Sequence, residues 1–523
     1  MAMPLFPVSS SDILLTHVSW SILFASTFAV LVWRLWRFTV RPQLYPDDPK
    51  ELPYWFPFVG HLWAFFQNSQ ALLSRGRRYF GNTREPFAVT VLGNTVYVLT
   101  RGKDVAEAYR NTKTFSFEVF VQHMMRTIGC SDKVVEKMYA PQDPARCRFP
   151  NPKGKPLAIL ARELHVHQLY PGKDLAYLGA RFNSYFDRHL RLEAIKSDRS
   201  YATPNVDGSV SLPLMVWVSD FLIRGGQRAY FGELLEEIDP DISWAFLDFD
   251  DLSWQILYQY PKVLSKKMHS AKERVTEALR KYFETSIAER SGDAWFTKAM
   301  ENEMRDLDLN TRDISIMMQT IYWGINTNTR RGCFWMLSYM LFHPEIIPLV
   351  MQETEQAFRD GNTTPDIDYL NDECPLTNSV WNEILRMSAA SSSVRYITQD
   401  TIIGGLKLRN GNKVMVPYRQ LHFDEAIFGD RVTEFNPKRF YDNPSLLKSP
   451  SWRPFGGGAT MCPGRFVAKQ AVVTFIAMAL NRFDISLDGP QPFPMAKEGN
   501  PVIGLMSNQP GSDLRVKISL RKA

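Results

Sequence analysis

The hydrophobic positions follow three patterns along the chain. Ile13 to Trp33 is an apolar run of 21 residues without a formal charge, and a helix of that length spans the roughly 30 Å core of a bilayer. Phe87 to Leu92 and Thr95 to Thr100 are β-rich runs around Gly93-Asn94, which predicts a hairpin. Most of the remaining chain has a helical period. The predicted helices lie near residues 155–192, 265–290, 311–342, 345–359 and 376–388.

Sheet-like runs return at residues 394–408 and 413–417, so the predicted fold class is mainly α with a small β portion. There is no internal repeat and no second linker, which favours one catalytic domain over two. The chain is 45% hydrophobic and 22% charged, which excludes disordered and collagen-like proteins. A net charge of +6 over 523 residues is too small for a nucleic-acid-binding surface.

The amino-terminal apolar run has the features of a retained signal anchor. Arg34, Arg37 and Arg41 follow it, whereas Asp12 and no Lys or Arg precede it, so the positive-inside rule places the downstream chain in the cytoplasm. The alternatives are a buried helix and a cleaved signal peptide, which prefers a basic start. We expect a luminal end over residues 1–12, the transmembrane anchor over 13–33, a basic and proline-rich linker over 34–60, and the catalytic domain over 61–523. The prolines predict that this linker is a stiff, extended spacer.

One of the five cysteines has an unusual local sequence. Cys462 follows the glycines of Phe455-Gly456-Gly457-Gly458 and precedes Pro463 and a helical pattern over residues 466–480. Proline suits a first helical position, which predicts Cys462 at the N-cap, where the helix dipole favours a thiolate. The other cysteines lack a CxxC partner and are expected to be ordinary reduced thiols. They are Cys130, Cys147, Cys333 and Cys374.

The loop resembles the haem-thiolate signature of the cytochromes P-450, Phe-x-x-Gly-x-x-x-Cys-x-Gly. Phe455, Gly458, Cys462 and Gly464 match the signature, and Gly456 lies within it. The resemblance implies the cytochrome P-450 fold after the anchor. It also implies a haem b cofactor whose iron takes the Cys462 thiolate as its axial ligand.

Two further segments resemble the family in the expected order. Glu383 and Arg386 stand three residues apart on a predicted helix, where Glu and Arg can pair. Arg439, within Phe435 to Phe440, resembles the residue that completes the Glu-Arg-Arg lock of the family. The resemblance implies that these three residues serve folding and haem retention.

The predicted helix from Thr311 to Leu341 resembles the distal helix of the family. Thr329 holds the position of the catalytic threonine, but Asn328 replaces the usual acid before it. An amide cannot exchange protons as a carboxylate does, although it can order water that does. The pattern resembles the branch of the sterol 7α-hydroxylases and prostacyclin synthase, and other parts of the chain resemble fungal biosynthetic members.

The resemblance also indicates partners for the haem propionates. Arg395 matches a strand residue that often binds a propionate, whereas Thr460 stands where the family often has Arg or His. The second partner has no clear match. His165 and His167 are weak candidates for it, because a buried or surface role is more common for a histidine.

By family analogy, four stretches should line the substrate pocket. They are residues 115–126, 322–329, 390–394 and 502–506. Their mixture of large apolar side chains with a few hydroxyls and amides favours a bulky, mostly apolar molecule. A terpenoid, steroid or alkaloid intermediate of secondary metabolism fits this description.

The resemblance implies a monooxygenase that uses O2 and electrons from NADPH through a separate membrane-bound reductase. Lys469, Arg465 and Arg453 are candidate docking residues for it. We expect the protein in the endoplasmic reticulum membrane, with a single span and a cytoplasmic catalytic domain. Two alternatives stay open: an oxygen-independent isomerase or dehydratase on the same fold, and a non-catalytic haem-binding membrane protein.

Overall fold

The structure is a computed structural model that describes residues 10–258, 260–499 and 501–521. The chain divides into two compact units, each described below by itself. The first unit takes in the residues up to Ser116 together with Val394–Val416, and the second takes in Phe117–Ser393 and Pro417 onward. The units interleave along the sequence, so no single linker separates them.

The first unit begins with a long helix. α1 (Ser10–Leu35) continues through a π turn (Trp36–Val40) into α2 (Arg41–Leu44). Within it, Trp20–Leu44 is long and apolar enough to cross a membrane, and its most apolar stretch contains no buried residue.

The segment expected to be an extended spacer is folded instead. The Arg37 guanidinium pairs with Glu51 at 2.6 Å, and Arg34 lies over the Trp55 ring at 4.0 Å. β1 (Lys50–Glu51) pairs in parallel with β2 (Phe87–Val91). The prolines interrupt the helix after Leu44, but ion pairs and a strand then hold the segment within the unit.

A six-stranded sheet, in the order β1-β2-β3-β10-β7-β4, forms the centre of the first unit. The predicted hairpin is present as β2 and β3 (Asn94–Val98), but its turn is at Leu92 and Gly93, which have φ angles of 49° and 74°. The other strands of the unit are β4 (Phe115–Ser116), β7 (Ser392–Ile397), β8 (Thr401–Ile403), β9 (Leu406–Leu408) and β10 (Lys413–Pro417). Its remaining helices are α3 (Leu62–Tyr79) and α4 (Gly102–Arg110).

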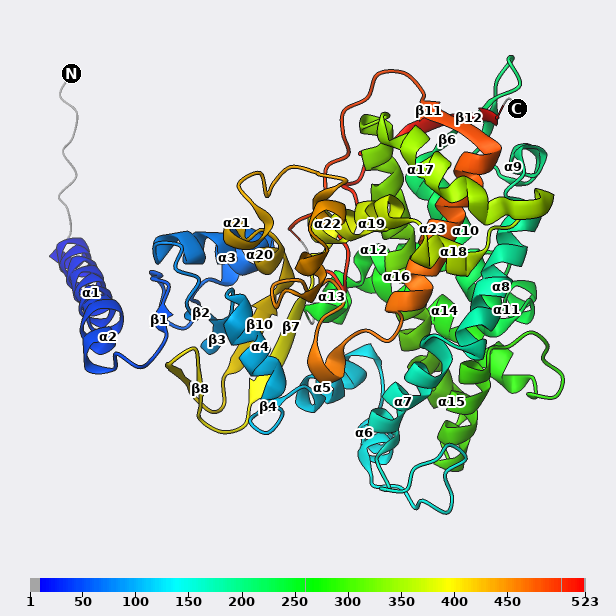
Figure 1. Ribbon diagram of the computed structural model, residues 1–523. Coiled ribbons are helices and arrows are strands. Elements are labelled where there is room, and N and C mark those ends of the chain that lie inside the picture. The colour runs from blue at the N-terminus through cyan, green and yellow to red at the C-terminus, as the bar shows by residue number, and fades with distance from the viewer. Residues whose placement is uncertain (1–9, 259, 500, 522–523) are drawn as a thin grey trace, which may run out of the picture. The chain divides into compact units, whose positions relative to one another are not determined.

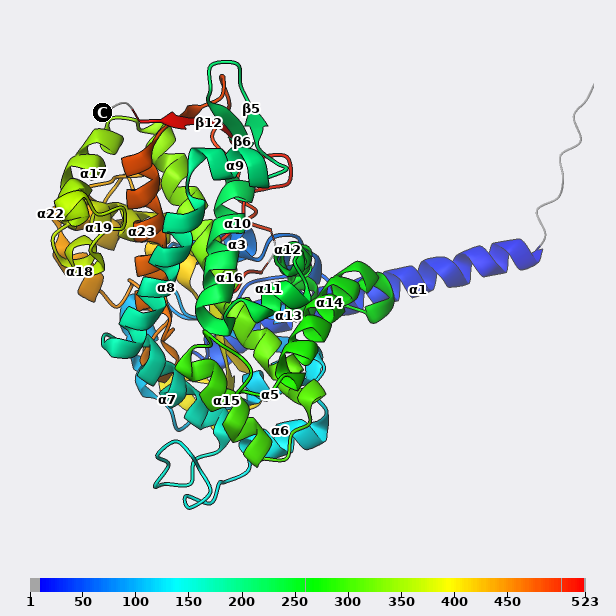
Figure 2. The same cartoon turned by 90° about the vertical axis from the view of Figure 1, so that its right-hand side faces the viewer.

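The second unit is built around α16 (Thr311–Phe342), which has the bounds that the sequence predicts. The Asn310 side chain caps its first turn by accepting from the Asp313 N–H at 2.9 Å. α16 makes its most extensive contacts with four of its neighbouring helices (Figure 1 and Figure 2). They are α10 (Leu214–Phe231), α14 (Lys266–Glu284), α19 (Pro375–Ser388) and α23 (Arg465–Arg482).

The remaining predictions for this unit hold with changed boundaries. The helical run near 155–192 is two helices, α7 (Leu157–Leu169) and α8 (Lys173–His189), separated at Pro171, and the run near 345–359 contains α17 (Ile346–Thr354). α10 was not predicted because it is buried on nearly all sides and therefore shows no amphipathic period.

The other elements of the second unit are short. The helices are α5 (Glu118–Ile128), α6 (Asp132–Tyr139), α9 (Leu192–Asp198), α11 (Leu234–Ile238), α12 (Ile242–Leu252), α13 (Trp254–Leu257), α15 (Trp295–Asp306), α18 (Ile367–Asp372), α20 (Tyr418–His422), α21 (Glu425–Phe428) and α22 (Arg439–Asp442). A four-stranded sheet has the order β11-β12-β6-β5. Its strands are β5 (Thr203–Pro204), β6 (Val210–Pro213), β11 (Phe483–Leu487) and β12 (Arg515–Leu520).

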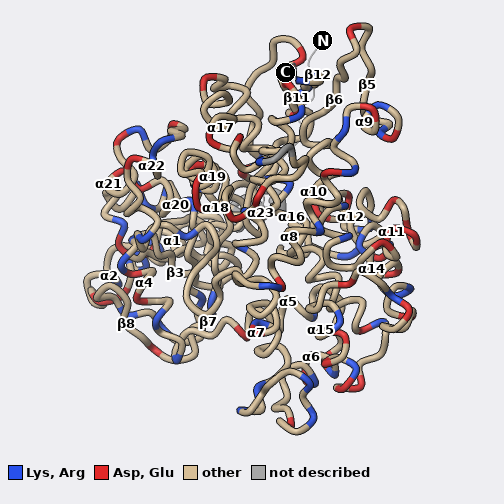
Figure 3. The backbone as a smooth tube through the Cα atoms, turned by 45° about the vertical axis from the view of Figure 1, so that its right-hand side comes forward, with Lys and Arg blue, Asp and Glu red and all other residues tan. Residues whose placement is uncertain are grey.

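Charge is distributed over both units. Basic and acidic stretches are scattered along each unit, and both signs occur in both units (Figure 3). This agrees with the small net charge.

Candidate functional site

The cysteine loop is closed on itself by glycine conformations and a backbone hydrogen bond. Gly456 and Gly458 have φ angles of 80° and 58°, which glycine adopts without strain. The Cys462 N–H donates to the Phe455 carbonyl at 2.9 Å. The loop therefore presents Cys462 on a tightly turned backbone.

The predicted N-cap position of Cys462 is wrong. α23 begins at Arg465 with Gly464 as its N-cap, so the sulfur lies two residues before the cap. Pro463 and Gly464 form a turn rather than the first helical residues, because the Gly464 backbone, with φ −76° and ψ 6°, lies outside α-helical geometry.

Cys462 differs from the other cysteines in its exposure. It is exposed, whereas the other four are buried or half-buried, and all five are free. Burial raises the pKa of Cys130 to about 11 and that of Cys374 to about 12, so these stay protonated. Although Cys462 is open to solvent, its dense surroundings raise its pKa too, and the Gly464 N–H and the Arg465 charge oppose that rise. These two groups are of the kind that stabilise a thiolate.

A buried carboxylate joins α19 to α22. The Glu383 carboxylate accepts from Arg386 Nε at 2.8 Å and Nη2 at 2.7 Å, and from Arg439 Nε at 3.1 Å to each oxygen. The side chains of Glu383 and Arg386 are fully buried, and that of Arg439 is 9% exposed. Three residues that the sequence analysis grouped by resemblance are therefore in contact.

The remaining donors of the two guanidiniums bind backbone carbonyls. Arg386 donates to the Val432 carbonyl at 2.7 Å and to the Glu434 carbonyl at 3.2 Å. Arg439 donates to the carbonyls of Phe428, Arg431 and Glu434. The cluster thus holds the chain from α21 to α22 against α19.

Thr329 and Asn328 lie on α16 and have different surroundings. Thr329 is buried, and its hydroxyl has no hydrogen-bond partner within the part of the chain that the structure describes. The Asn328 amide donates to the Ile503 carbonyl at 2.8 Å and accepts from the Leu505 N–H at 3.0 Å. The Asn328 amide thus binds the backbone of the 503–505 segment, and its expected role in ordering water for proton delivery stays a prediction.

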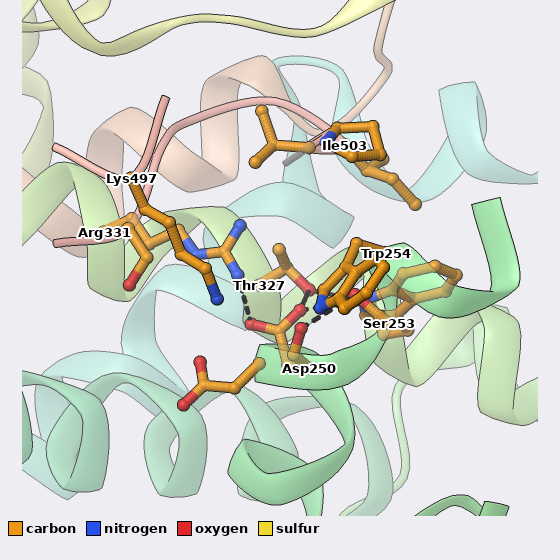
Figure 4. A pocket seen from close by; sticks show the side chains of 12 residues that line it. Asp250, Ser253, Trp254, Thr327, Arg331, Lys497 and Ile503 are labelled. Atoms are coloured by element: carbon orange, nitrogen blue, oxygen red, sulfur yellow. Dashed lines mark hydrogen bonds and ion pairs between the residues drawn. The ribbon is translucent and has the colours of Figure 1, made fainter. Parts of the chain in front are cut away.

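A buried charge cluster that the sequence did not predict is centred on Asp250 of α12. Its carboxylate accepts from Trp323 Nε1 at 2.9 Å, Thr327 Oγ1 at 3.0 Å, Arg331 Nη2 at 2.6 Å and Arg330. Figure 4 shows Arg331 and Thr327 meeting this carboxylate. Burial alone would raise the pKa of Asp250, but the two arginines outweigh it and hold that pKa below its ordinary value.

One signal in the sequence pointed to this cluster. Arg330 and Arg331 are adjacent charges inside a long helix whose other residues are mostly apolar, and buried charges require partners. The pocket beside the cluster has a volume of about 30 Å³ and is lined by residues that include Asp250, Trp254, Arg331 and Lys497. Its lining also includes Thr327, Val502 and Ile503, which belong to two of the stretches expected to line the substrate pocket.

The candidate propionate partners have unequal support. Arg395 of β7 is buried and lies over the Tyr109 ring at 5.1 Å within the first unit, and its role stays a prediction. Burial lowers the pKa of His165 to about 4, so this side chain is neutral near pH 7. His165 packs on Phe296 at 4.1 Å and His167 on Trp295 at 4.2 Å. Both rings therefore pack on α15, and neither is supported as a cationic partner.

The candidate docking residues are mostly engaged within the chain. Lys469 donates to the Asn371 carbonyl at 3.3 Å, and burial lowers its pKa. Arg465 lies over the rings of Tyr170 at 4.6 Å and Phe466 at 4.3 Å. Lys469 is thus a weaker candidate than its charge suggested.

The residues present fit a haem with an axial thiolate. The chain offers one exposed cysteine on a glycine-rich loop, with an N–H and a guanidinium that favour its ionised form. α23, which follows that loop, packs against α16, which carries Thr329. A mainly helical fold with this loop and a buried Glu-Arg-Arg cluster defines the haem-thiolate class of proteins.

Comparison with known proteins agrees with this class. The family model "Cytochrome P450" matches residues 230–516, more than half of the chain, so the chain belongs to the cytochrome P450 family. The relatives include the cytochrome P450 monooxygenase poxD of Penicillium oxalicum, which is 22% identical over 89% of this chain and 93% of its own length. The enzyme class is thus that of a P450 monooxygenase.

Two further comparisons confirm the expected fold and resemblance. The cholesterol 7-alpha-monooxygenase of Cricetulus griseus is 27% identical over 46% of this chain and 52% of its own length. The retinoic acid-bound cyanobacterial CYP120A1 superposes with a TM-score of 0.67 at 16% identity, covering 91% of this chain and 99% of its own. At that identity the superposition shows the fold alone.

Proposed function

We propose that this protein is a membrane-anchored monooxygenase that holds haem b through Cys462 and oxidises a bulky, mostly apolar small molecule. The observation that carries the proposal is the exposed residue Cys462 on its glycine loop, whose thiol lies beside the Gly464 N–H and Arg465. When bound, the haem supplies dioxygen activation and electron transfer. Hydroxylation of a C–H bond is the reaction that we expect.

Different residues of the chain have different proposed roles in holding the haem. Cys462 donates electron density as a thiolate. Gly456 and Gly458 let the backbone adopt the turns that present this sulfur. Arg395 is proposed to pair with a propionate, and Glu383 with its two arginines is proposed to secure the structure that retains the cofactor.

A terpenoid, steroid or alkaloid intermediate of secondary metabolism is the proposed substrate. Leu505 and Met506 of the expected pocket wall are buried and apolar. Two related proteins carry cholesterol and retinoic acid in their names, and both molecules are bulky and mostly apolar. Several similar monooxygenases come from fungi.

A gene deletion combined with reconstitution tests the proposed reaction. The deletion strain should accumulate the substrate, and the purified protein should convert that compound only with O2, NADPH and a membrane-bound reductase. Conversion without reductase and O2 would instead identify an isomerase or dehydratase. An unchanged metabolite profile would favour a non-catalytic haem-binding protein.

We predict that Thr329→Ala uncouples oxygen use from product formation. The buried hydroxyl is proposed to hold a water that delivers protons, and such transfers contribute on the order of 10²-fold or more to a rate. Product per NADPH consumed should fall strongly while hydrogen peroxide rises. Thr320→Ala is the matched control, because Thr320 is an exposed residue of the same helix. Unchanged coupling in Thr329→Ala would remove the proposed proton role.

We propose that the protein is anchored in the endoplasmic reticulum membrane with its catalytic part in the cytoplasm. The apolar helix through Leu44 supports the anchor. Trp55, Phe56, Phe58 and Trp63 of the same unit are 58% to 79% exposed, and aromatic side chains of this kind favour membrane interfaces.

We predict that two charges in the helix release the protein from membranes. Phe24 and Phe28 are 75% and 61% exposed, and a lysine near the centre of a spanning helix costs about 2.5–3.5 kcal/mol. The Phe24→Lys, Phe28→Lys double variant should move from the carbonate-washed membrane pellet to the soluble fraction. Leu349→Lys, at an exposed residue of α17, is the control and should stay in the pellet. Retention of the double variant would show that this helix is not the anchor.

A further inference from the structure

Residues 503–506 form a short segment that bends at Ile503 and Gly504 and is hydrogen-bonded on both sides of its backbone. On one side it meets the end of α19 and the residues that follow. The Gly504 carbonyl accepts from the N–H groups of Ala390 at 2.9 Å and Ser391 at 3.2 Å, and the Met506 N–H donates to the Ser388 carbonyl at 2.9 Å. This side resembles an ordinary strand pairing.

On the other side the partners are side chains of α16. Asn328 binds the Ile503 carbonyl and the Leu505 N–H, Arg331 Nη1 donates to the Leu505 carbonyl at 3.1 Å, and Trp335 Nε1 donates to the Met506 carbonyl at 2.7 Å. These three residues are spaced by three and four positions, so they share one face of the helix. Together they form a row of polar side chains, which makes the backbone hydrogen bonds that a neighbouring strand would otherwise make.

The row accounts for the residue type at position 328. The amide must donate to one backbone group and accept from another, with the oxygen and nitrogen assigned from these partners. An aspartate could accept from the Leu505 N–H, but it would place a second oxygen against the Ile503 carbonyl without a proton between them. An asparagine is therefore suited to this contact, and the acid of most family members is not.

Gly504 provides a second, independent constraint at the same point. Its φ is +125°, and a Cβ placed there would lie 2.4 Å from Asn328 Oδ1. A side chain at this position would push the segment away from α16. Glycine is required because the segment approaches the helix this closely.

The row is also tied to α12. Arg331 uses its Nη2 to pair with Asp250 while its Nη1 holds the Leu505 carbonyl, as Figure 4 shows for the pair. The guanidinium is nearly fully buried, so its orientation is determined by these partners. α12, α16 and the 503–506 segment are thereby joined through one side chain.

We propose that Asn328, Arg331 and Trp335 are positioning residues that set the place of the 503–506 segment and so decide how bulky a ligand is admitted. The inference rests on the proposed function, in which residues 390–394 and 502–506 line the substrate pocket. Asn328 acts through this segment and not in proton delivery.

The test uses the purified full-length holoenzyme and two haem-binding probes, imidazole and clotrimazole. Imidazole is small, so its dissociation constant depends on access to the iron alone. Clotrimazole is bulky, so its dissociation constant also depends on the position of the pocket wall. Asn328→Asp should change the dissociation constant of clotrimazole at least tenfold and that of imidazole less than twofold. Hydrogen exchange at residues 503–506 should accelerate at least tenfold. Gly504→Ala should reproduce both effects. Its added Cβ would collide with Asn328 and so disturb the same contact from the side of the segment.

Asn310→Asp is the matched control. This asparagine also lies at α16, but only its oxygen is used, as an acceptor at the helix N-cap, and aspartate is an equally good cap. It should leave both probes and hydrogen exchange unchanged.

Three outcomes would overturn the inference. The first is an Asn328→Asp protein whose clotrimazole affinity and hydrogen exchange at residues 503–506 are both unchanged. The second is a variant that loses affinity for imidazole and clotrimazole to the same extent. The third is a variant that couples oxygen use to product formation better than the wild type, which would return position 328 to proton delivery. The proposed function fails separately, if the wild-type protein lacks the thiolate-specific absorption of its reduced carbonyl complex. Hydrogen exchange still tests the positioning role in that case.

Discussion

The Cys462→Ser variant is expected to lose the thiolate-specific absorption of its reduced carbonyl complex together with all measurable product formation. Serine keeps the size and the loop but replaces sulfur by a hydroxyl, which stays protonated where a thiolate forms. The exposure of Cys462 and its contacts with the Gly464 N–H and Arg465 are the reasons for placing the largest effect here. Absorption spectra of the reduced, carbon monoxide-treated protein measure it directly.

Cys147→Ser is the matched control for that variant. Cys147 is half-buried and free, and its sulfur is 3.2 Å from Gln142 Oε1, a contact that a serine hydroxyl can keep. This control should retain the spectrum and the activity. A Cys462→Ser protein with the wild-type spectrum would show that another residue binds the iron.

The Glu383→Gln variant is expected to unfold more easily and to lose its cofactor. Glu383 accepts hydrogen bonds from two buried guanidiniums and from the Asn436 N–H at 3.0 Å. Neutralising it leaves two positive charges without a counter-charge inside the protein, and breaking a buried ion pair in this way costs about 3–5 kcal/mol. Denaturant unfolding measures the stability, and the haem absorbance after gel filtration measures retention.

Glu277→Gln provides the control with the same spacing. Glu277 and Arg280 of α14 are also three residues apart and pair at 2.7 Å, but both are partly exposed, and pairs of that kind contribute little. This variant should unfold like the wild type. If the two variants lose the same unfolding free energy, burial is not the reason for the contribution of the Glu383 cluster to stability.

Much of the fold was predictable because its signals are local. The helix over 311–342 has the bounds that its periodicity indicates, and Gly93 marks the hairpin within one residue of its observed turn. α10 was missed since a helix buried on nearly all sides has too narrow a polar face to reveal its period. The strands β6, β11 and β12 were missed because they are short and acquire their partners only from distant parts of the chain.

In the candidate site, too, the features with local sequence signals were predictable, whereas those that depend on tertiary contacts were not. The glycine loop with Cys462 is contiguous in the sequence, and a motif of ten residues is enough to recognise it. The cap position of Cys462 was mispredicted because Pro463 suits either a helix start or a turn, and the backbone at Gly464 adopts the turn. The histidines 165 and 167 looked like charge partners until their packing against α15 was known.

By itself the sequence determined the family signature, the apolar anchor candidate and the long helix of the second unit, since each depends on neighbours within a few turns. Only the tertiary structure decided what Asn328 and Asp250 contact. Asn328 binds a segment 175 residues away, and Asp250 meets Arg330 80 residues away. A buried polar group must find its partner wherever the fold brings one, and one sequence contains no local signal for that choice.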